Sequence, residues 1–121
     1  MARFMLILEG KPHCYQHLSP DEMQRVFEKY RAWGDSMRAT GRLAGGDKLR
    51  DEGGKIVSAV KGKVSVVDGP YSEAREVVGG YMMLQAESYE EAVALVSNNP
   101  HLEFGRITIR AVDPMGCGKD A

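Results

Sequence analysis

The sequence predicts a single α+β domain: a ferredoxin-like split βαβ arrangement with an extra hairpin strand. Two observations carry this prediction. Strand-like and helix-like hydrophobic patterns follow one another in the order β, α, several β, α, β. The chain has 121 residues, which suits one compact domain with its own core. We place the domain at residues 1–114 and expect a disordered tail over 115–121, where apolar residues are scarce.

The first elements are a strand and a long helix. Phe4–Leu8 is an apolar run typical of a buried strand, and Gly10 with the following Pro12 ends it. Ser19 is a helix N-cap with Pro20 in the first helical position. Apolar residues then recur at steps of three or four until Gly41, so one face of this helix packs on the sheet.

The middle of the chain predicts three short strands. Leu43–Leu49 is a strand bent at its Gly-Gly pair, and the charged turn 50–54 follows it. Ile56–Val60 and Val64–Val67 are separated by the turn at 61–63 and pair as an antiparallel hairpin.

The last third predicts strand, helix and strand. Gly80–Ala86 is a strand, and a helix with capping-box spacing from Ser88 to Glu91 runs to the stop at 98–100. Ile107–Val112 is the final strand. Because two helices cover only one face of a sheet, the other face needs a partner chain or a ligand, and we expect a homodimer through it.

Composition excludes several classes of function. Sixteen basic and 17 acidic residues give a net charge of -1, which argues against nucleic acid and anionic membranes as partners. The apolar run at the N-terminus is too short to span a membrane. Together with the low cysteine content, this predicts a reduced, cytoplasmic protein.

We expect no metal and no cofactor. Cys14 and Cys117 lack metal-ligand spacing, and the alternative of a site at Cys14, His13 and His17 has no partner cluster elsewhere. Gly79-Gly80 lies outside any phosphate-binding glycine frame, so nucleotide binding is not predicted.

Asp68 is the leading candidate for a catalytic residue. It ends a strand and precedes the turn formers Gly69 and Pro70, which hold a carboxylate at the strand terminus. If it faces a cavity, it can act as a general base. The alternative is an ordinary turn-forming aspartate that accepts nearby backbone N–H groups.

Six further residues are candidates. His101 follows a helix-ending Asn-Pro and could lean over the sheet edge as an acid-base group that is neutral or charged near pH 7, or else it is a surface or capping histidine. The others would bind substrate: aromatic rings could line a pocket for a flat ring, and charged groups could contact a polar substrate. Each has a structural alternative, in the core or on a solvated face. The substrate-binding candidates are Tyr30, Trp33, Tyr71, Glu73 and Arg110.

A resemblance to a known family rests on five stretches of sequence. They are Gly41-Arg42-Leu43, Gly46-x-x-Leu49, the block from Asp68-Gly69-Pro70-Tyr71 to Gly80, Asn99-Pro100-His101, and Arg106 to Arg110. The chain resembles the YCII-related proteins, in the DGPF-domain branch, with Tyr71 where Phe is usual. The resemblance implies a dimeric α+β barrel in which the aspartate at this position works with a histidine on the first helix. Residues 20–40 contain no histidine, so His101 is the alternative partner.

Two functions stay open. In the first, the protein is a small enzyme in which Asp68 transfers a proton on a small cyclic or enol-like metabolite. In the second, it is a non-catalytic module that senses a ligand or docks a partner protein. Similar proteins are often encoded beside extracytoplasmic-function sigma factors, which suits an accessory role in their regulation.

Overall fold

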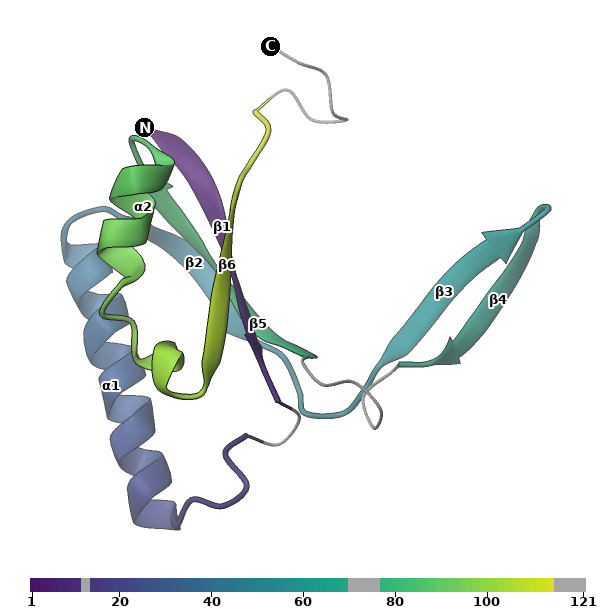
Figure 1. Cartoon of the computed structure of the whole chain (residues 1–121), viewed down its shortest axis with the longest axis horizontal. Helices are drawn as coiled ribbons and strands as arrows, with labels where there is room; N and C mark the ends of the chain where they lie inside the picture. The colour runs from purple at the N-terminus through teal and green to yellow at the C-terminus, as the bar shows by residue number, and fades with distance from the viewer. Residues whose placement is uncertain (12–13, 70–76, 115–121) are drawn as a thin grey trace.

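The computed structural model describes residues 1–11, 14–69 and 77–114, and its elements follow the predicted order. Figure 1 shows them as two helices on one side of a sheet and a hairpin that projects from the body. The elements are β1 (Ala2–Gly10), α1 (Pro20–Ala39), β2 (Leu43–Lys48), β3 (Lys55–Val60), β4 (Lys63–Asp68), β5 (Val77–Ala86), α2 (Tyr89–Val96), the short 3₁₀ helix η1 (Pro100–Glu103) and β6 (Gly105–Ala111).

The main sheet is antiparallel and has the strand order β2-β5-β1-β6. β5 lies between β1 and β2, which α1 connects, so this is the split βαβ arrangement. The register of β2 against β5 shifts between Leu43 and Gly45, as expected from the Gly-Gly pair. The α+β class predicted from the sequence is confirmed.

The core lies between the two helices and one face of the sheet. Leu6 on β1 and Leu84 on β5 are fully buried there. Truncating either to Ala would cost roughly 2–5 kcal/mol, because the surroundings collapse only partly around the lost volume. The remaining buried members of this cluster are Phe4, Trp33, Met37, Ala86, Ala92 and Val96.

Local capping chemistry sets where α1 begins and ends. Ser19 accepts a hydrogen bond from the Glu22 N–H, and the Glu22 carboxylate accepts one from the Ser19 N–H, a full capping box. At the other end Gly41 has φ +72°, the left-handed conformation that glycine adopts without strain.

The capping box expected at α2 forms only in half. Ser88 accepts from the Glu91 N–H as predicted. The Glu91 carboxylate, however, accepts from the Glu87 N–H and forms an ion pair with Arg42. The Glu87 hydrogen bond and then the Arg42 side chain lower the pKa of Glu91. The Glu91 side chain does not close the capping box because it is engaged by Arg42, the residue just before β2, and by the Glu87 N–H.

The β3–β4 hairpin is a separate two-stranded sheet that projects from the body, and we call it the arm. Lys61 and Gly62 connect its strands with positive φ at both positions, as in a type I′ turn. Every residue of both strands is exposed. The predicted hairpin is therefore present, but it does not extend the main sheet. Neither helix of the described residues is long and apolar enough to span a membrane.

Candidate functional site

A cavity of about 310 Å³ opens between α1 and the β2–β5 half of the sheet. This volume falls at the lower end of the range typical of small-molecule sites, about 300–1,000 Å³. Apolar and aromatic groups make up most of its walls. The residues around it are Leu8, Tyr15, Phe27, Tyr30, Gly34, Arg38, Leu43, Gly45, Gly46, Asp47, Lys48, Gly79, Gly80, Tyr81, Met82 and His101.

Three side chains in the cavity wall form one continuous hydrogen-bond chain, which we call the relay. The Tyr15 and Tyr30 hydroxyl oxygens are 2.6 Å apart, and the Tyr30 hydroxyl is 3.1 Å from His101 Nδ1. His101 Nε2 is 2.8 Å from the backbone carbonyl oxygen of Glu9. The relay therefore joins a loop, α1, η1 and β1.

The Glu9 carbonyl fixes the direction of the relay. Because a carbonyl only accepts, His101 Nε2 carries the proton, and in neutral imidazole Nδ1 is then the acceptor. Tyr30 must donate its single proton to Nδ1, so Tyr15 donates to Tyr30. The Tyr15 oxygen is left with a free acceptor site of its own.

Burial favours the neutral form of the two tyrosines of the relay. His101 is 5% exposed, and burial is the main cause that raises the pKa of both Tyr15 and Tyr30. The two tyrosines also interact with each other. His101 and Tyr15 also border a second cavity of about 240 Å³ near Cys14. Tyr15 and His101 therefore belong to the walls of both cavities.

Backbone geometry positions His101. The Asn99 side chain accepts the His101 N–H at 2.8 Å and caps η1, whose first residue is Pro100. The Glu9 carbonyl lies so close to Gly105 that a Cβ there would be 1.9 Å from its oxygen. A glycine at this position lets β6 approach β1 and leaves the carbonyl free for the histidine.

Charged groups sit at the edge of the first cavity. The Tyr81 hydroxyl donates to the Asp47 carboxylate at 2.8 Å, which raises the pKa of Tyr81. Arg38 and Lys48 each form an ion pair with an acidic residue three positions away. The three charged residues, Arg38, Asp47 and Lys48, are exposed, so their ion pairs contribute little to stability and their charges are available to a polar ligand.

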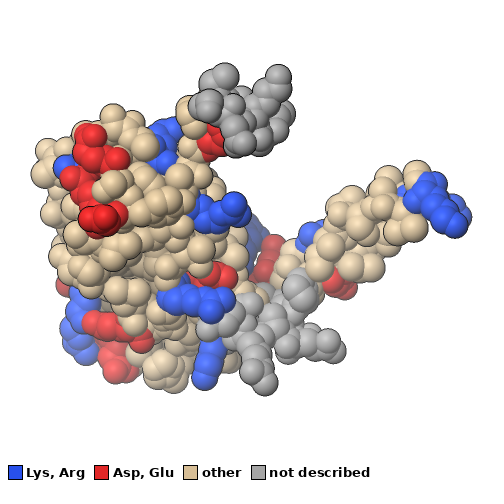
Figure 2. Space-filling model, turned by 45° about the horizontal axis from the view of Figure 1, so that its top comes forward, with Lys and Arg blue, Asp and Glu red and all other residues tan. Residues whose placement is uncertain are grey.

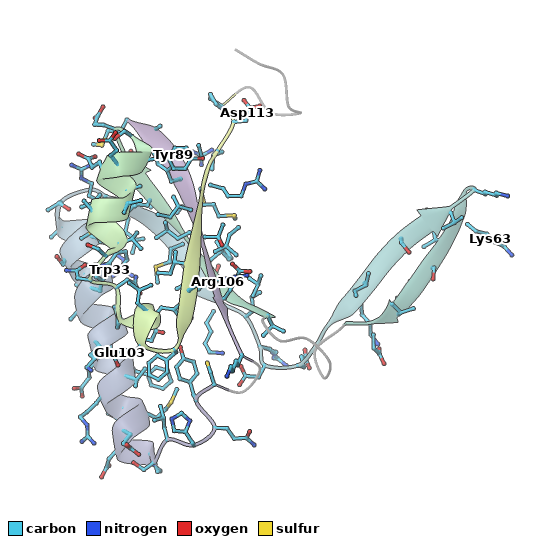
Figure 3. The ribbon with its side chains drawn as sticks, viewed as in Figure 1. Trp33, Lys63, Tyr89, Glu103, Arg106 and Asp113 are labelled. Atoms are coloured by element: carbon cyan, nitrogen blue, oxygen red, sulfur yellow. The ribbon has the colours of Figure 1, made fainter. Side chains whose placement is uncertain are left out.

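The structure brings together two of the residues proposed from the sequence and separates two others. His101 and Tyr30 are hydrogen-bonded in the cavity wall. Trp33 lies in the core, where its indole N–H donates to Asn98 Oδ1 at 3.0 Å (Figure 3). Arg110 is exposed on β6, paired with Met5 of β1 on the face away from the helices.

Asp68 lies at the base of the arm and not at either cavity. Its side chain is 85% exposed and forms an ion pair with Lys55, its cross-strand partner, at 2.5 Å. The expected pairing of Asp68 with His101 does not occur among the described residues. Tyr71 and Glu73, also proposed from the sequence, lie outside the described residues.

Tyr15 is the site residue that the sequence did not predict. It belongs to an irregular segment after β1, and no periodic pattern or motif marks it. Tyr15 joins the site only through its hydrogen bond with Tyr30, fifteen positions further along the chain, and such a contact is visible only in the folded structure. In the part of the chain that the structure describes, no group of three or more His, Cys, Asp or Glu residues could hold a metal ion.

Comparison with known proteins identifies the family. The model of the YCII-related domain matches residues 2–116. No curated protein matches the sequence. A similar solved structure is 5-chloro-2-hydroxyhydroquinone dehydrochlorinase (TftG) from Burkholderia phenoliruptrix in complex with 2,5-dihydroxybenzoquinone, with TM-score 0.54 at 15% identity over 92% of this chain and 93% of that chain. At that identity the likeness shows a shared fold. The family match covers nearly the whole chain, and the chain belongs to the YCII-related domain family.

Proposed function

We propose that this protein is a small acid-base enzyme that binds a flat cyclic or enol-like metabolite between α1 and the sheet and transfers its proton through the relay. The observation that carries the proposal is the unbroken hydrogen-bond chain from Tyr15 through Tyr30 to His101 in the wall of the cavity. A chain of this kind moves a proton from the ligand to a buried base without exposing that base to bulk water.

The proton moves in one concerted step. The substrate hydroxyl gives its proton to the Tyr15 oxygen, Tyr15 gives its own to Tyr30, and Tyr30 gives its own to His101 Nδ1. His101 becomes an imidazolium whose Nε2–H stays on the Glu9 carbonyl. The substrate is left as an oxyanion that accepts a hydrogen bond from the Tyr15 hydroxyl. Reversal of the step returns the proton.

The raised tyrosine pKa values support this division of roles. Burial disfavours the phenolate forms of Tyr15 and Tyr30, so neither hydroxyl holds the negative charge. Each tyrosine is neutral before and after the transfer. The proton therefore ends on His101, and the charge separation lies between the substrate and the imidazole.

The cavity walls suit a flat ring. Phe27 and Tyr30 lie on the α1 side, and two glycine pairs, Gly45-Gly46 and Gly79-Gly80, line the strand side without side chains. The similar fold of a dehydrochlorinase named for a hydroxyhydroquinone substrate and bound to a dihydroxybenzoquinone supports a cyclic, hydroxyl-bearing compound. This chemistry matches a relay whose first acceptor is the Tyr15 oxygen.

In this proposal His101 takes the proton in place of Asp68. The Asp68 carboxylate is exposed and paired with Lys55, whereas the His101 imidazole is buried at the cavity. We assign Asp68 a structural role, as the partner of Lys55 in the ion pair that links β3 and β4 at the base of the arm.

A second candidate function is ligand sensing without chemistry. Both ring nitrogens of His101 have hydrogen-bond partners within the chain itself. Because its hydrogen bonds are already complete at His101, the relay can also hold the Tyr15 oxygen in a fixed position, where it accepts a hydrogen bond from a ligand hydroxyl without any proton transfer.

The test combines binding with proton exchange. The probes are 2,5-dihydroxybenzoquinone, whose binding is followed by fluorescence, and a cyclic β-diketone. The enol hydroxyl of the diketone gives its proton to the relay, and NMR follows the deuterium that the resulting enolate takes up at carbon. We expect Tyr30→Phe and His101→Ala to slow exchange by at least about 100-fold while the probe still binds. Tyr89→Phe is the matched control, because Tyr89 lies outside both cavities. Binding without exchange in the wild type would favour sensing, and no binding of either probe would contradict both functions.

A further inference from the structure

The residues of α1 that line the first cavity form one stripe along the helix. Tyr30, Gly34 and Arg38 follow one another at steps of four, and Phe27 precedes Tyr30 by three. Residues at these spacings lie on the same side of a helix. Because Tyr30 belongs to the relay, the stripe carries both the proton path and a permanent cation along one wall of the cavity.

The Arg38 side chain folds back along α1 onto Gly34. A Cβ at position 34 would lie 3.4 Å from each of the two terminal nitrogens of Arg38. Side chains of a helix point toward its N-terminus, which explains this direction. Gly34 lies one helical turn from Tyr30, roughly 6 Å along the axis. The relay and the guanidinium are thus separated along the wall by about the width of one ring.

The guanidinium of Arg38 has hydrogen-bond donors to spare. Its Nη1 donates to Asp35 Oδ1 at 2.8 Å. Within residues 1–11, 14–69 and 77–114 this guanidinium forms no other hydrogen bond. A guanidinium carries five N–H groups in a planar fork that suits a carboxylate. Asp35 therefore steadies the Arg38 side chain without occupying its fork.

The strand side of the cavity offers no comparable cation among the described residues. Lys48 donates to Asp51 Oδ1 at 3.1 Å and to the Leu49 carbonyl oxygen at 3.0 Å. The neighbouring Asp47 also lines the cavity and carries a negative charge. A negative group on a ligand is repelled by Asp47 and attracted by Arg38, so it is directed to the α1 side.

A general attraction for anions does not act in place of Arg38. The chain has a net charge of -1, and Figure 2 shows acidic and basic side chains interspersed over the body. A protein with such a mixed surface has no broad positive field that would gather anions. Selectivity for a negative ligand therefore has to come from the walls of the cavity.

We propose that the compound bound in this cavity is a hydroxylated ring or enol that also carries a carboxylate, and that Arg38 binds this carboxylate. The inference rests on the proposed function, because the relay engages the hydroxyl end of the same compound. The carboxylate takes the open edge of the guanidinium, and the hydroxyl gives its proton to Tyr15. Arg38 is thus a specificity-determining residue that selects acids over neutral rings and fixes the ring relative to the relay.

The test compares two probes that differ by one charge. One is 2,5-dihydroxybenzoate, which is ionised at neutral pH, and the other is 2,5-dihydroxybenzamide, which has nearly the same shape and no charge. Calorimetric titration of the full chain measures both dissociation constants. We expect the benzoate to bind the wild type at least about tenfold more tightly, since a bidentate pair with arginine is a strong hydrogen-bonded contact.

Two arginine variants assign the preference. In Arg38→Gln the ratio of the two dissociation constants should fall to about one, because the charged fork is gone. Arg31→Gln is the matched control and should keep the wild-type ratio, because Arg31 is an exposed arginine of α1 outside both cavities. Neither substitution threatens the fold, since exposed charges of this kind contribute little to stability.

Salt gives a second readout that needs no substitution. The Arg38 side chain is 60% exposed, so the preference for the benzoate should shrink by at least about threefold between about 0.05 M and about 1 M sodium chloride. A benzoate that binds no more tightly than the benzamide, or a preference that persists in Arg38→Gln, overturns the inference and leaves the relay proposal standing. If neither probe binds and hydroquinone does not bind either, the proposed function itself is wrong and the inference falls with it.

Discussion

Removal of one hydroxyl group, by Tyr30→Phe, tests the relay through stability. The substitution deletes the 2.6 Å contact with Tyr15 and the 3.1 Å contact with His101 Nδ1. Tyr15 is half-buried and can turn to water, but His101 is 5% exposed, so its Nδ1 loses a donor that water does not readily replace. An unsatisfied buried acceptor costs about 1–3 kcal/mol, and we expect a loss of about 2 kcal/mol.

Urea unfolding measures this loss. For a domain of this size the urea dependence of the unfolding free energy is roughly 2 kcal/mol per molar, so about 2 kcal/mol lowers the midpoint by about 1 M. All proteins are compared at one protein concentration, because the apparent stability of a chain that associates with itself depends on concentration. Tyr89→Phe removes an exposed hydroxyl that accepts the Ala111 N–H, and it should cost less than about 1 kcal/mol. A midpoint shift for Tyr30→Phe no larger than that of Tyr89→Phe would refute the relay geometry.

Three further predictions follow from pKa shifts and close packing. Burial raises the pKa of Tyr30 above its usual 10.0, so the stabilising effect of the neutral phenol is complete below pH 10 and is lost as the pH rises through the folded-state value. Above pH 10 the free energy of unfolding should therefore fall by up to about 1.4 kcal/mol per pH unit, and it should fall less steeply in Tyr30→Phe. The Thr108 hydroxyl hydrogen bond is the main cause that lowers the pKa of the Glu9 carboxyl below 4.5, so stability should decline as the pH falls below 4.5, with a shallower decline in Glu9→Gln. Gly105→Ala should destabilise strongly in urea, because its Cβ would lie 1.9 Å from the Glu9 carbonyl oxygen, whereas Gly79→Ala meets its nearest atom at 3.9 Å and should cost under about 1 kcal/mol. Equal losses for the two alanine variants would contradict the packing described at β1 and β6.

The elements were predictable where local chemistry decides them. Ser19 and Pro20 mark the start of α1, and the Gly-Gly pair marks the irregularity of β2. The place of the hairpin was not predictable, because strands 56–60 and 64–67 show the same pattern whether they join a sheet or leave it. Strand partners are chosen by long-range contacts, which short sequence windows do not contain.

The site was predictable in part. His101 and Tyr30 stood out as a titratable group and an aromatic ring, and both line the cavity. Trp33 has the same aromatic character, but its position on α1 turns it into the core. Asp68 has a strong turn signal, yet that signal describes backbone geometry and says nothing of which surface the carboxylate faces. Tyr15 joins the site through a contact with α1 that no local pattern encodes.

The most direct test of the proton path is the nitrogen NMR spectrum of the His101 ring, recorded at neutral pH without ligand and with bound hydroquinone, a flat ring that still carries its hydroxyl protons at that pH. His101→Asn identifies its signals by their loss. We predict a neutral ring without ligand, protonated at Nε2 and unprotonated at Nδ1, and an imidazolium when the relay takes up the ligand's proton. A ring protonated at Nδ1 without ligand, or one unchanged by the bound ligand, would contradict proton transfer through Tyr15 and Tyr30 to His101.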